Sequence, residues 1–196
     1  KTRATDQAEA QQILENLINN QFIVSEVKAS DAERNPRAPF TTSTLQQEAN
    51  SKLGFSSKQT MSAAQKLYQA GKITYMRTDS TVLSKQIIAS ARDYITATYG
   101  ENYHKARNFA TKSASAQEAH EAIRPTNLAV ESAGSSAQEK KLYDLIRKRT
   151  LAGQMAPAQL KKTTAVITAQ PANTAFVAQG EVVAFPGFLA LYENLS

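Results

Sequence analysis

Strand-like segments lie towards both ends of the sequence, and a long helical region separates them. Gln21–Lys28 is rich in β-branched and aromatic residues, and Thr163–Thr168 and Thr174–Ala184 alternate between apolar and other residues. Phe188–Tyr192 is expected to form one more short strand. This order predicts an α+β, mainly helical fold, in which a helical unit is inserted into a discontinuous, strand-containing domain.

Changes in composition indicate where the inserted unit begins and ends. Ala29–Pro39 is a polar connector with two prolines, and strand-like alternation returns after Pro157. We therefore expect residues 39–155 to form the helical domain, and residues 1–38 and 156–196 to form the strand-containing domain together.

Apolar periodicity and capping residues predict the helices. Ser43 with Gln46, and Ser136 with Glu139, have the spacing of capping boxes, and Gly54 is a typical residue after a helix end. The expected helices cover residues 6–20 with Asp6 as cap, 43–53, 58–70 after Ser56 or Ser57, about 80–99 after Asp79, Ser80 or Ser84, and 136–152. The second and third, joined by a glycine-containing turn, resemble a CAP-like helix-turn-helix. The same spacing also fits an ordinary pair of core helices.

The charge balance favours an anionic partner. The 196 residues carry a formal net charge of +6, which is compatible with nucleic acid but does not identify it. There is no cysteine, which fits a reducing, cytoplasmic compartment, and no apolar run is long enough to span a membrane. Lys1 in place of methionine suggests a piece of a longer protein. The basic residues of interest are Arg34, Arg37, Lys52, Lys58, Lys66, Lys72, Arg77, Arg92, Arg107, Lys112, Lys140, Lys141, Arg147, Lys148 and Arg149.

The run Ile73–Ser80 (Ile-Thr-Tyr-Met-Arg-Thr-Asp-Ser) combines a phenol with a guanidinium. If the segment is extended, Tyr75 and Arg77 point to the same side, and Arg77 can hold two oxygens of a phosphate that Tyr75 attacks. A nearby cation lowers the pKa of a phenol from its ordinary value of about 10. Asp79 could cap the next helix or orient Arg77. The alternative is a half-buried tyrosine beside a surface arginine.

A second group of reactive side chains lies in His120-Glu-Ala-Ile-Arg124-Pro-Thr126. His120 could transfer a proton or contact a phosphate, and Pro125 makes Arg124 extended. The alternative is the exposed side of a turn. The pattern is not the His-Glu-x-x-His zinc motif, because Arg124 stands at the position of the second histidine. The sequence also has no Gly-rich phosphate loop and no Asp-x-Asp pair, so no Mg²⁺ site is visible.

These motifs resemble those of a known family, the type IA DNA topoisomerases. Ile73–Ser80 is similar to their active-site signature and His120–Thr126 to their second signature. Pro39–Ala49 resembles the segment that opens their helical gate domain, and Gly180–Leu189 resembles a strand pair of their arch domain. The His-Glu-Ala-Ile-Arg form is closer to bacterial topoisomerase I than to topoisomerase III.

The resemblance implies an ATP-independent relaxation of negatively supercoiled DNA. A tyrosine attacks a backbone phosphate of single-stranded DNA in an underwound region and stays attached to its 5′ end; another strand passes, and the free 3′ hydroxyl reverses the bond. The resemblance assigns the catalytic roles to Tyr75 and Arg77. It assigns DNA contacts to His120, Arg124, Asp79, Gln65, Gln69 and Lys72.

The chain also departs from the family. The Toprim domain, which carries the acidic Mg²⁺ site and the Glu and Lys that assist proton transfer, does not occur in this sequence. We expect no cofactor within the chain, Mg²⁺ in the intact enzyme, and the remaining domains of the same polypeptide as partners. The fragment alone is expected to be inactive. The alternative function is a non-catalytic helix-turn-helix DNA-binding module. A tyrosine recombinase is disfavoured, because its separated Arg and His residues and its tyrosine near the C-terminus are not found.

Overall fold

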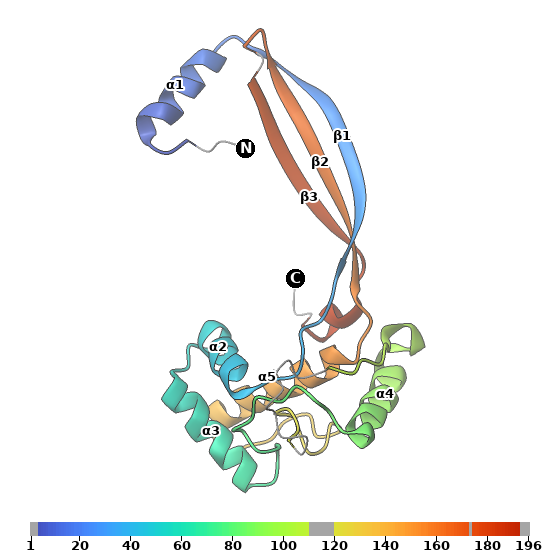
Figure 1. The fold of residues 1–196 in the computed structure, drawn as a ribbon. Coiled ribbons are helices and arrows are strands. Elements are labelled where there is room, and N and C mark those ends of the chain that lie inside the picture. The colour runs from blue at the N-terminus through green and yellow to red at the C-terminus, as the bar shows by residue number, and fades with distance from the viewer. Residues whose placement is uncertain (1–3, 110–119, 173, 193–196) are drawn as a thin grey trace. The chain divides into compact units, whose positions relative to one another are not determined.

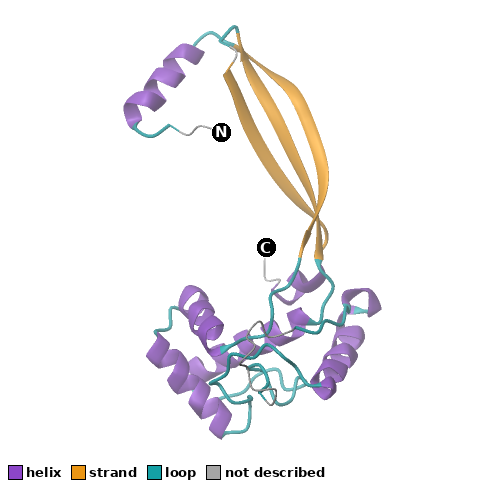
Figure 2. Ribbon diagram, in the orientation of Figure 1, coloured by secondary structure: helices purple, strands orange, loops and turns teal. Residues whose placement is uncertain are grey.

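The computed structural model describes residues 4–109, 120–172 and 174–192, which fold into two units (Figure 1). The first unit comprises Lys1–Glu33 and Gln159–Phe185, and the second comprises Arg34–Ala158 and Pro186–Ser196. Helices and an antiparallel sheet are both present, which confirms the α+β class (Figure 2).

The first unit contains a helix and a three-stranded sheet. Helix α1 (Gln7–Leu17) begins after Asp6, whose carboxylate accepts a hydrogen bond from the Glu9 amide at 2.9 Å. The strands β1 (Gln21–Arg34), β2 (Ala158–Gln170) and β3 (Thr174–Phe185) lie in the order β1-β2-β3. β2 and β3 pair antiparallel, with Val166 opposite Val177.

β1 continues to Arg34, whereas the sequence predicts that the strand ends at Lys28 and a connector follows. Nearly all of β1 is exposed, so its polar second half lacks the apolar periodicity by which strands are recognised. The Ser25 hydroxyl donates to the Val166 carbonyl, and the side-chain amide of Gln159 donates to the Glu33 carboxylate. These contacts show that β1 and β2 run in opposite directions over this length.

The second unit is built from helices around one apolar core (Figures 1 and 2). Its elements are α2 (Thr42–Leu53), α3 (Ser57–Gln69), α4 (Lys85–Tyr99), η1 (Glu101–Tyr103), α5 (Ala137–Gly153) and η2 (Gly187–Tyr192). The core includes Phe40, Leu45, Leu67, Ile73, Met76, Ile123, Leu142, Tyr143 and Ile146. None of the helices in the described part of the chain has the length and apolar character needed to cross a lipid bilayer.

Capping explains most of the helix boundaries. Ser56 with Gln59 forms a capping box at α3, the Ser136 hydroxyl accepts from the Glu139 amide at α5, and Gly54 ends α2 in the left-handed conformation. The box expected from Ser43 is wrong: Thr41 and Thr44 form it, so α2 begins earlier. Threonine caps a helix nearly as well as serine, and the sequence offers both in adjacent positions.

The segment after β3 is not the predicted strand. Gly187–Tyr192 forms the 3₁₀ helix η2, and Phe188 and Leu191 are buried in the second unit. Gly187 has a φ of 51°, and any side chain there would clash with the Pro157 carbonyl. Residues 186–192 therefore cluster with the helical unit, whereas the sequence division placed them in the strand-containing domain.

Candidate active site

The two sequence motifs that carry the reactive side chains are hydrogen-bonded to each other. The Thr74 amide donates to the Arg124 carbonyl at 2.9 Å, and the Arg124 amide donates to the Thr74 hydroxyl at 2.9 Å. The Thr126 amide donates to the Lys72 carbonyl at 3.0 Å. Segments that are far apart in the sequence thus lie side by side.

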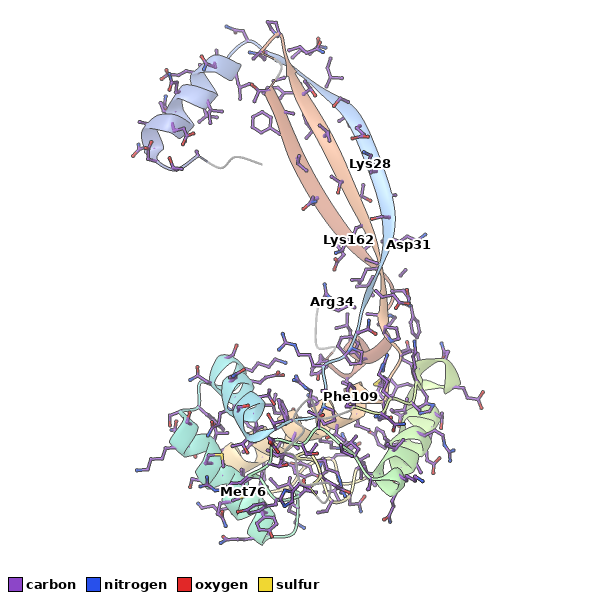
Figure 3. The ribbon with its side chains drawn as sticks, in the orientation of Figure 1. Lys28, Asp31, Arg34, Met76, Phe109 and Lys162 are labelled. Carbon is purple, nitrogen blue, oxygen red and sulfur yellow. The ribbon has the colours of Figure 1, made fainter. Side chains whose placement is uncertain are left out.

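The segment around Tyr75 is not the strand that the sequence predicts. Ile73 makes a single antiparallel bridge with Pro125, and Pro125 has no amide hydrogen with which to extend a ladder. Ile73 and Met76 are both buried in the core of the helical unit, where Figure 3 labels Met76. Between these two anchors the backbone holds Tyr75 at the surface, with 46% of the residue exposed.

A third segment fixes the backbone on both sides of Arg77. The hydroxyl of Thr42, the first residue of α2, donates to the Met76 carbonyl at 2.7 Å and accepts from the Thr78 amide at 2.9 Å. The Thr42 amide in turn donates to the Thr78 carbonyl at 2.9 Å. α2 therefore positions the arginine that follows the candidate nucleophile.

Tyr75, Arg77 and His120 line one cavity of about 330 Å³. Tyr68, Thr74, Thr78 and Glu121 complete its wall. The cavity unites a phenol that can act as a nucleophile, a guanidinium that can hold a phosphate, and an imidazole that can donate or accept a proton. Between residues 4 and 192, leaving aside 110–119 and 173, no group of three or more His, Asp and Glu side chains is arranged to hold a metal ion.

Tyr68 is a residue of this site that the sequence reasoning missed. The Tyr68 and Tyr75 rings meet edge to face, with centroids 5.2 Å apart and an interplanar angle of 63°. Tyr68 lies on α3, three residues after Gln65, and so shares a helix face with a residue that was singled out. An aromatic residue on the helix that leads to the motif was therefore a usable signal.

Apart from His120, none of the predicted DNA-contact residues lines this cavity. The Arg124 Nε donates to Glu121 at 2.7 Å, so an ion pair within the motif engages this guanidinium. Gln69 and Lys72 line a different cavity beside Lys66 and Glu139. Gln65 is half-buried and lines neither of these two cavities.

Asp79 is exposed and does not cap α4. The N-cap residue is Ser84, one of the three candidates, and its side chain makes no capping hydrogen bond. α4 thus begins at Lys85, later than the motif suggests, and none of its residues lines the tyrosine cavity.

The basic residues of α5 are only partly exposed. Arg147 and Arg149 on α5 are buried, and their Nε groups donate to the carbonyls of Leu128 and Ala38. Arg147 also stacks on the Tyr94 ring, at 4.8 Å from its centroid. Lys140 and Lys141 remain exposed, and Lys112 lies outside the described residues.

Comparisons with known proteins agree on one family. A family model described as DNA topoisomerase matches residues 1–196. The chain is 46% identical to DNA topoisomerase 1 of Zymomonas mobilis, over 99% of this chain and 16% of that protein, and 46% identical to that of Synechococcus elongatus, over 95% and 22%. It thus spans about a fifth of the length of these relatives. The structure of full-length topoisomerase I from Thermotoga maritima matches with a TM-score of 0.82 and 37% identity, over 98% of this chain and 32% of that chain.

Proposed function

The chain belongs to the DNA topoisomerase family, and from this premise we propose that it is the part of a type IA enzyme that carries the nucleophilic tyrosine. The observation that supports this role is the cavity in which an exposed Tyr75 lies with Arg77 and His120. The proposed substrate is the single-stranded region of underwound DNA in the bacterial cytoplasm, at the nucleoid.

The proposed reaction exchanges one phosphate ester for another. The Tyr75 hydroxyl loses its proton as its oxygen bonds to the phosphorus, the bond between the phosphorus and the 3′ oxygen breaks, and the 3′ oxygen takes up a proton and leaves as a hydroxyl. The tyrosine is then esterified to the 5′ end, and the 3′ hydroxyl reverses both bond changes after a strand has passed. No net bond energy is needed, so the cycle requires no ATP. The Arg77 fork would hold two non-bridging oxygens and offset the charge that develops on them.

The remaining polar groups have supporting roles in this proposal. His120 is exposed at the cavity and would contact the phosphate or the departing hydroxyl. Glu121 accepts from Arg124, so this pair would fix the wall of the cavity rather than react. When bound, Mg²⁺ would supply additional positive charge beside the phosphate, and we propose that a Toprim domain of the intact enzyme holds it.

A role as a separate helix-turn-helix module is less well supported. α2 and α3 are joined by a short turn at Gly54, as in such modules. However, α2 holds the backbone beside Arg77 through Thr42, and α3 brings Tyr68 to Tyr75. Both helices therefore help to build the tyrosine cavity.

We further propose that the rest of the same polypeptide covers the apolar surface of the first unit. α1 and the sheet leave large apolar side chains exposed, among them Leu14, Ile18, Phe22, Val24, Val27 and Val182. Surface of this kind usually marks an interaction site. The chain spans about a fifth of its relatives' length, so the intact polypeptide has ample additional residues to provide this cover.

Oligonucleotide cleavage tests the proposed function. With Mg²⁺ and a labelled single-stranded oligonucleotide, the full-length enzyme is expected to form a covalent adduct between Tyr75 and the 5′ phosphate. The 196-residue chain alone is expected to form it at least about 10²-fold more slowly, because general acid–base assistance alone typically contributes 10²–10⁴. The measurement is a denaturing gel, with the modified residue identified by mass spectrometry. An adduct formed by the chain at the rate of the intact enzyme, or an adduct on another residue, would contradict the proposal.

Tyr68 is expected to act as a positioning residue for Tyr75. Tyr68→Ala should slow single-turnover cleavage by about tenfold, because an edge-to-face pair contributes roughly 0.5–1.5 kcal/mol and Tyr75 becomes less ordered without it. Tyr68→Phe keeps the ring and should retain the normal rate, whereas oligonucleotide affinity should change little in either variant. If both variants were equally slow, the hydroxyl rather than the ring contact would be responsible.

A further inference from the structure

A second polar groove follows α2. Two cavities of about 410 and 420 Å³ share the side chains of Arg37, Glu48, Lys52 and Arg149. Thr44, Gln47 and Ser51 line one cavity with them, and Phe188 and Tyr192 are among the residues that line the other. We call the two cavities together the α2 groove. None of its lining residues lines the tyrosine cavity.

The centre of the α2 groove carries an excess of positive charge. Glu48 is only 8% exposed and lies 2.9 Å from Lys52 Nζ and 2.6 Å from Arg149 Nη1. Burial acts to raise the pKa of Glu48, but the hydrogen bond from Lys52 and the charges of Arg149 and Lys52 outweigh it and hold the pKa below its usual value. The single carboxylate is therefore ionised at neutral pH, and three cations surround it.

All three cations lie near Glu48, but they differ in distance and in exposure. Arg149 is 8% exposed; besides Glu48, it donates to the Ala38 carbonyl and packs over the Phe40 ring. Arg37 is 79% exposed, and its Nη1 lies 3.6 Å from Glu48, which is beyond the ordinary hydrogen-bond distance. Lys52 pairs with Glu48 at 2.9 Å and its Nζ lies 4.9 Å from the centroid of the Tyr192 ring, but 49% of its side chain is exposed. Arg149 therefore fixes the groove, Arg37 presents its donors to whatever enters it, and Lys52 can reach a ligand with the exposed part of its side chain.

The arrangement of donors fits a chain of phosphates better than a single anion. Gln47, Ser51 and Lys52 follow α2 over roughly 8 Å, at about 1.5 Å per residue, which is longer than one phosphate group. Neutral donors lie beside cations on this side, and two aromatic residues, Phe188 and Tyr192, are part of the wall of the other cavity. Grooves that bind single-stranded DNA commonly combine backbone-tracking cations with aromatic surface.

We propose that the α2 groove binds the phosphodiester backbone of single-stranded DNA at a place separate from the bond that Tyr75 attacks. The choice of DNA as the ligand rests on the proposed function, but binding in the groove does not require the Tyr75 chemistry. Arg37 and Lys52 contact the phosphates, and Glu48 and Arg149 keep the groove in shape.

Fluorescence anisotropy with a labelled oligothymidylate tests this proposal on the 196-residue chain. Arg37→Ala and Lys52→Ala should each weaken binding by about tenfold, because each removes a charge-assisted phosphate contact. Each should also reduce the slope of log Kd against log salt by about 0.7, the contribution of one contact to a single strand. The control is Lys58→Ala, which removes an equal charge from an exposed α3 position outside the groove and should leave both quantities nearly unchanged.

The same assay distinguishes a DNA-binding groove from a site for small phosphate compounds, and it tests the groove independently of the proposed function. Inorganic phosphate or thymidine monophosphate at millimolar concentration should not displace the oligonucleotide; displacement would indicate a small-anion site and overturn the proposal. Equal losses in Arg37→Ala, Lys52→Ala and Lys58→Ala would also overturn it, because they would reflect net charge alone. The assay measures binding and not cleavage, so a failure of the catalytic assignment of Tyr75 leaves this result independent.

Discussion

Replacing Tyr75 with phenylalanine in the full-length enzyme is expected to lower the rate of DNA relaxation by about 10⁴-fold or more. The substitution removes only the phenol oxygen, which is the atom proposed to bond to phosphorus. Tyr68 is the one other tyrosine among the residues that line the cavity. Tyr75 is about half exposed, so its ring can stay in place and folding should be retained. Relaxation of supercoiled plasmid, followed on agarose gels, measures the effect.

A second tyrosine provides the matched control for this experiment. Tyr99→Phe removes the same atom from α4, at a residue that does not line the tyrosine cavity, and should relax DNA at the normal rate. DNA affinity should be unchanged in both variants. Substantial relaxation by Tyr75→Phe would show that another group is the nucleophile, and Tyr68 would then be tested in the same way because its ring lies against Tyr75.

Most helices could be predicted, and the candidate residues around Tyr75 could be selected, because the signals for both are local. Capping serines and glycines with a left-handed backbone mark most helix ends, as Ser56, Gly54 and Ser136 do. Tyr75 and Arg77 are two positions apart in the sequence, so the conformation of only a short segment decides whether their side chains lie together. They line one cavity although the segment is not a strand, because the buried Ile73 and Met76 and the hydroxyl of Thr42 fix the backbone there.

What the sequence did not reveal depends on contacts between distant segments. The full length of β1 was missed because a strand exposed on both faces needs no apolar alternation. The groove around Glu48 was missed because α2, α5 and η2 together form it. In the sequence, Glu48 looks like any glutamate on the surface of a helix. Only the fold shows that Arg149, in an apparently basic helix face, lies buried against this carboxylate.

The Glu48–Arg149 pair leads to the second large prediction. Arg149→Met is expected to lower the free energy of unfolding of the helical unit by about 3 kcal/mol, because it removes the nearest cation from a buried carboxylate and leaves the half-exposed Lys52 at 2.9 Å and the exposed Arg37 at 3.6 Å. It also removes the hydrogen bond to the Ala38 carbonyl and the contact with the Phe40 ring. Chemical denaturation followed by far-ultraviolet circular dichroism measures it, since the helices of this unit contribute most of the signal.

The control substitution lies on the same helix. Lys148→Met breaks the partly exposed pair with Asp144, whose oxygen lies 2.9 Å from Lys148 Nζ, and should change stability by less than about 0.5 kcal/mol. Acidity provides an independent check. Because folding lowers the pKa of Glu48 from about 4.5, the unfolded chain binds its proton more tightly, so the contribution of this carboxylate is complete above that value and is lost as the pH falls through the folded pKa. The difference between the normal chain and Arg149→Met should therefore shrink in acid. A difference that persisted in full after Glu48 had become protonated would assign the stabilisation to the Ala38 hydrogen bond and the Phe40 contact rather than to the ion pair.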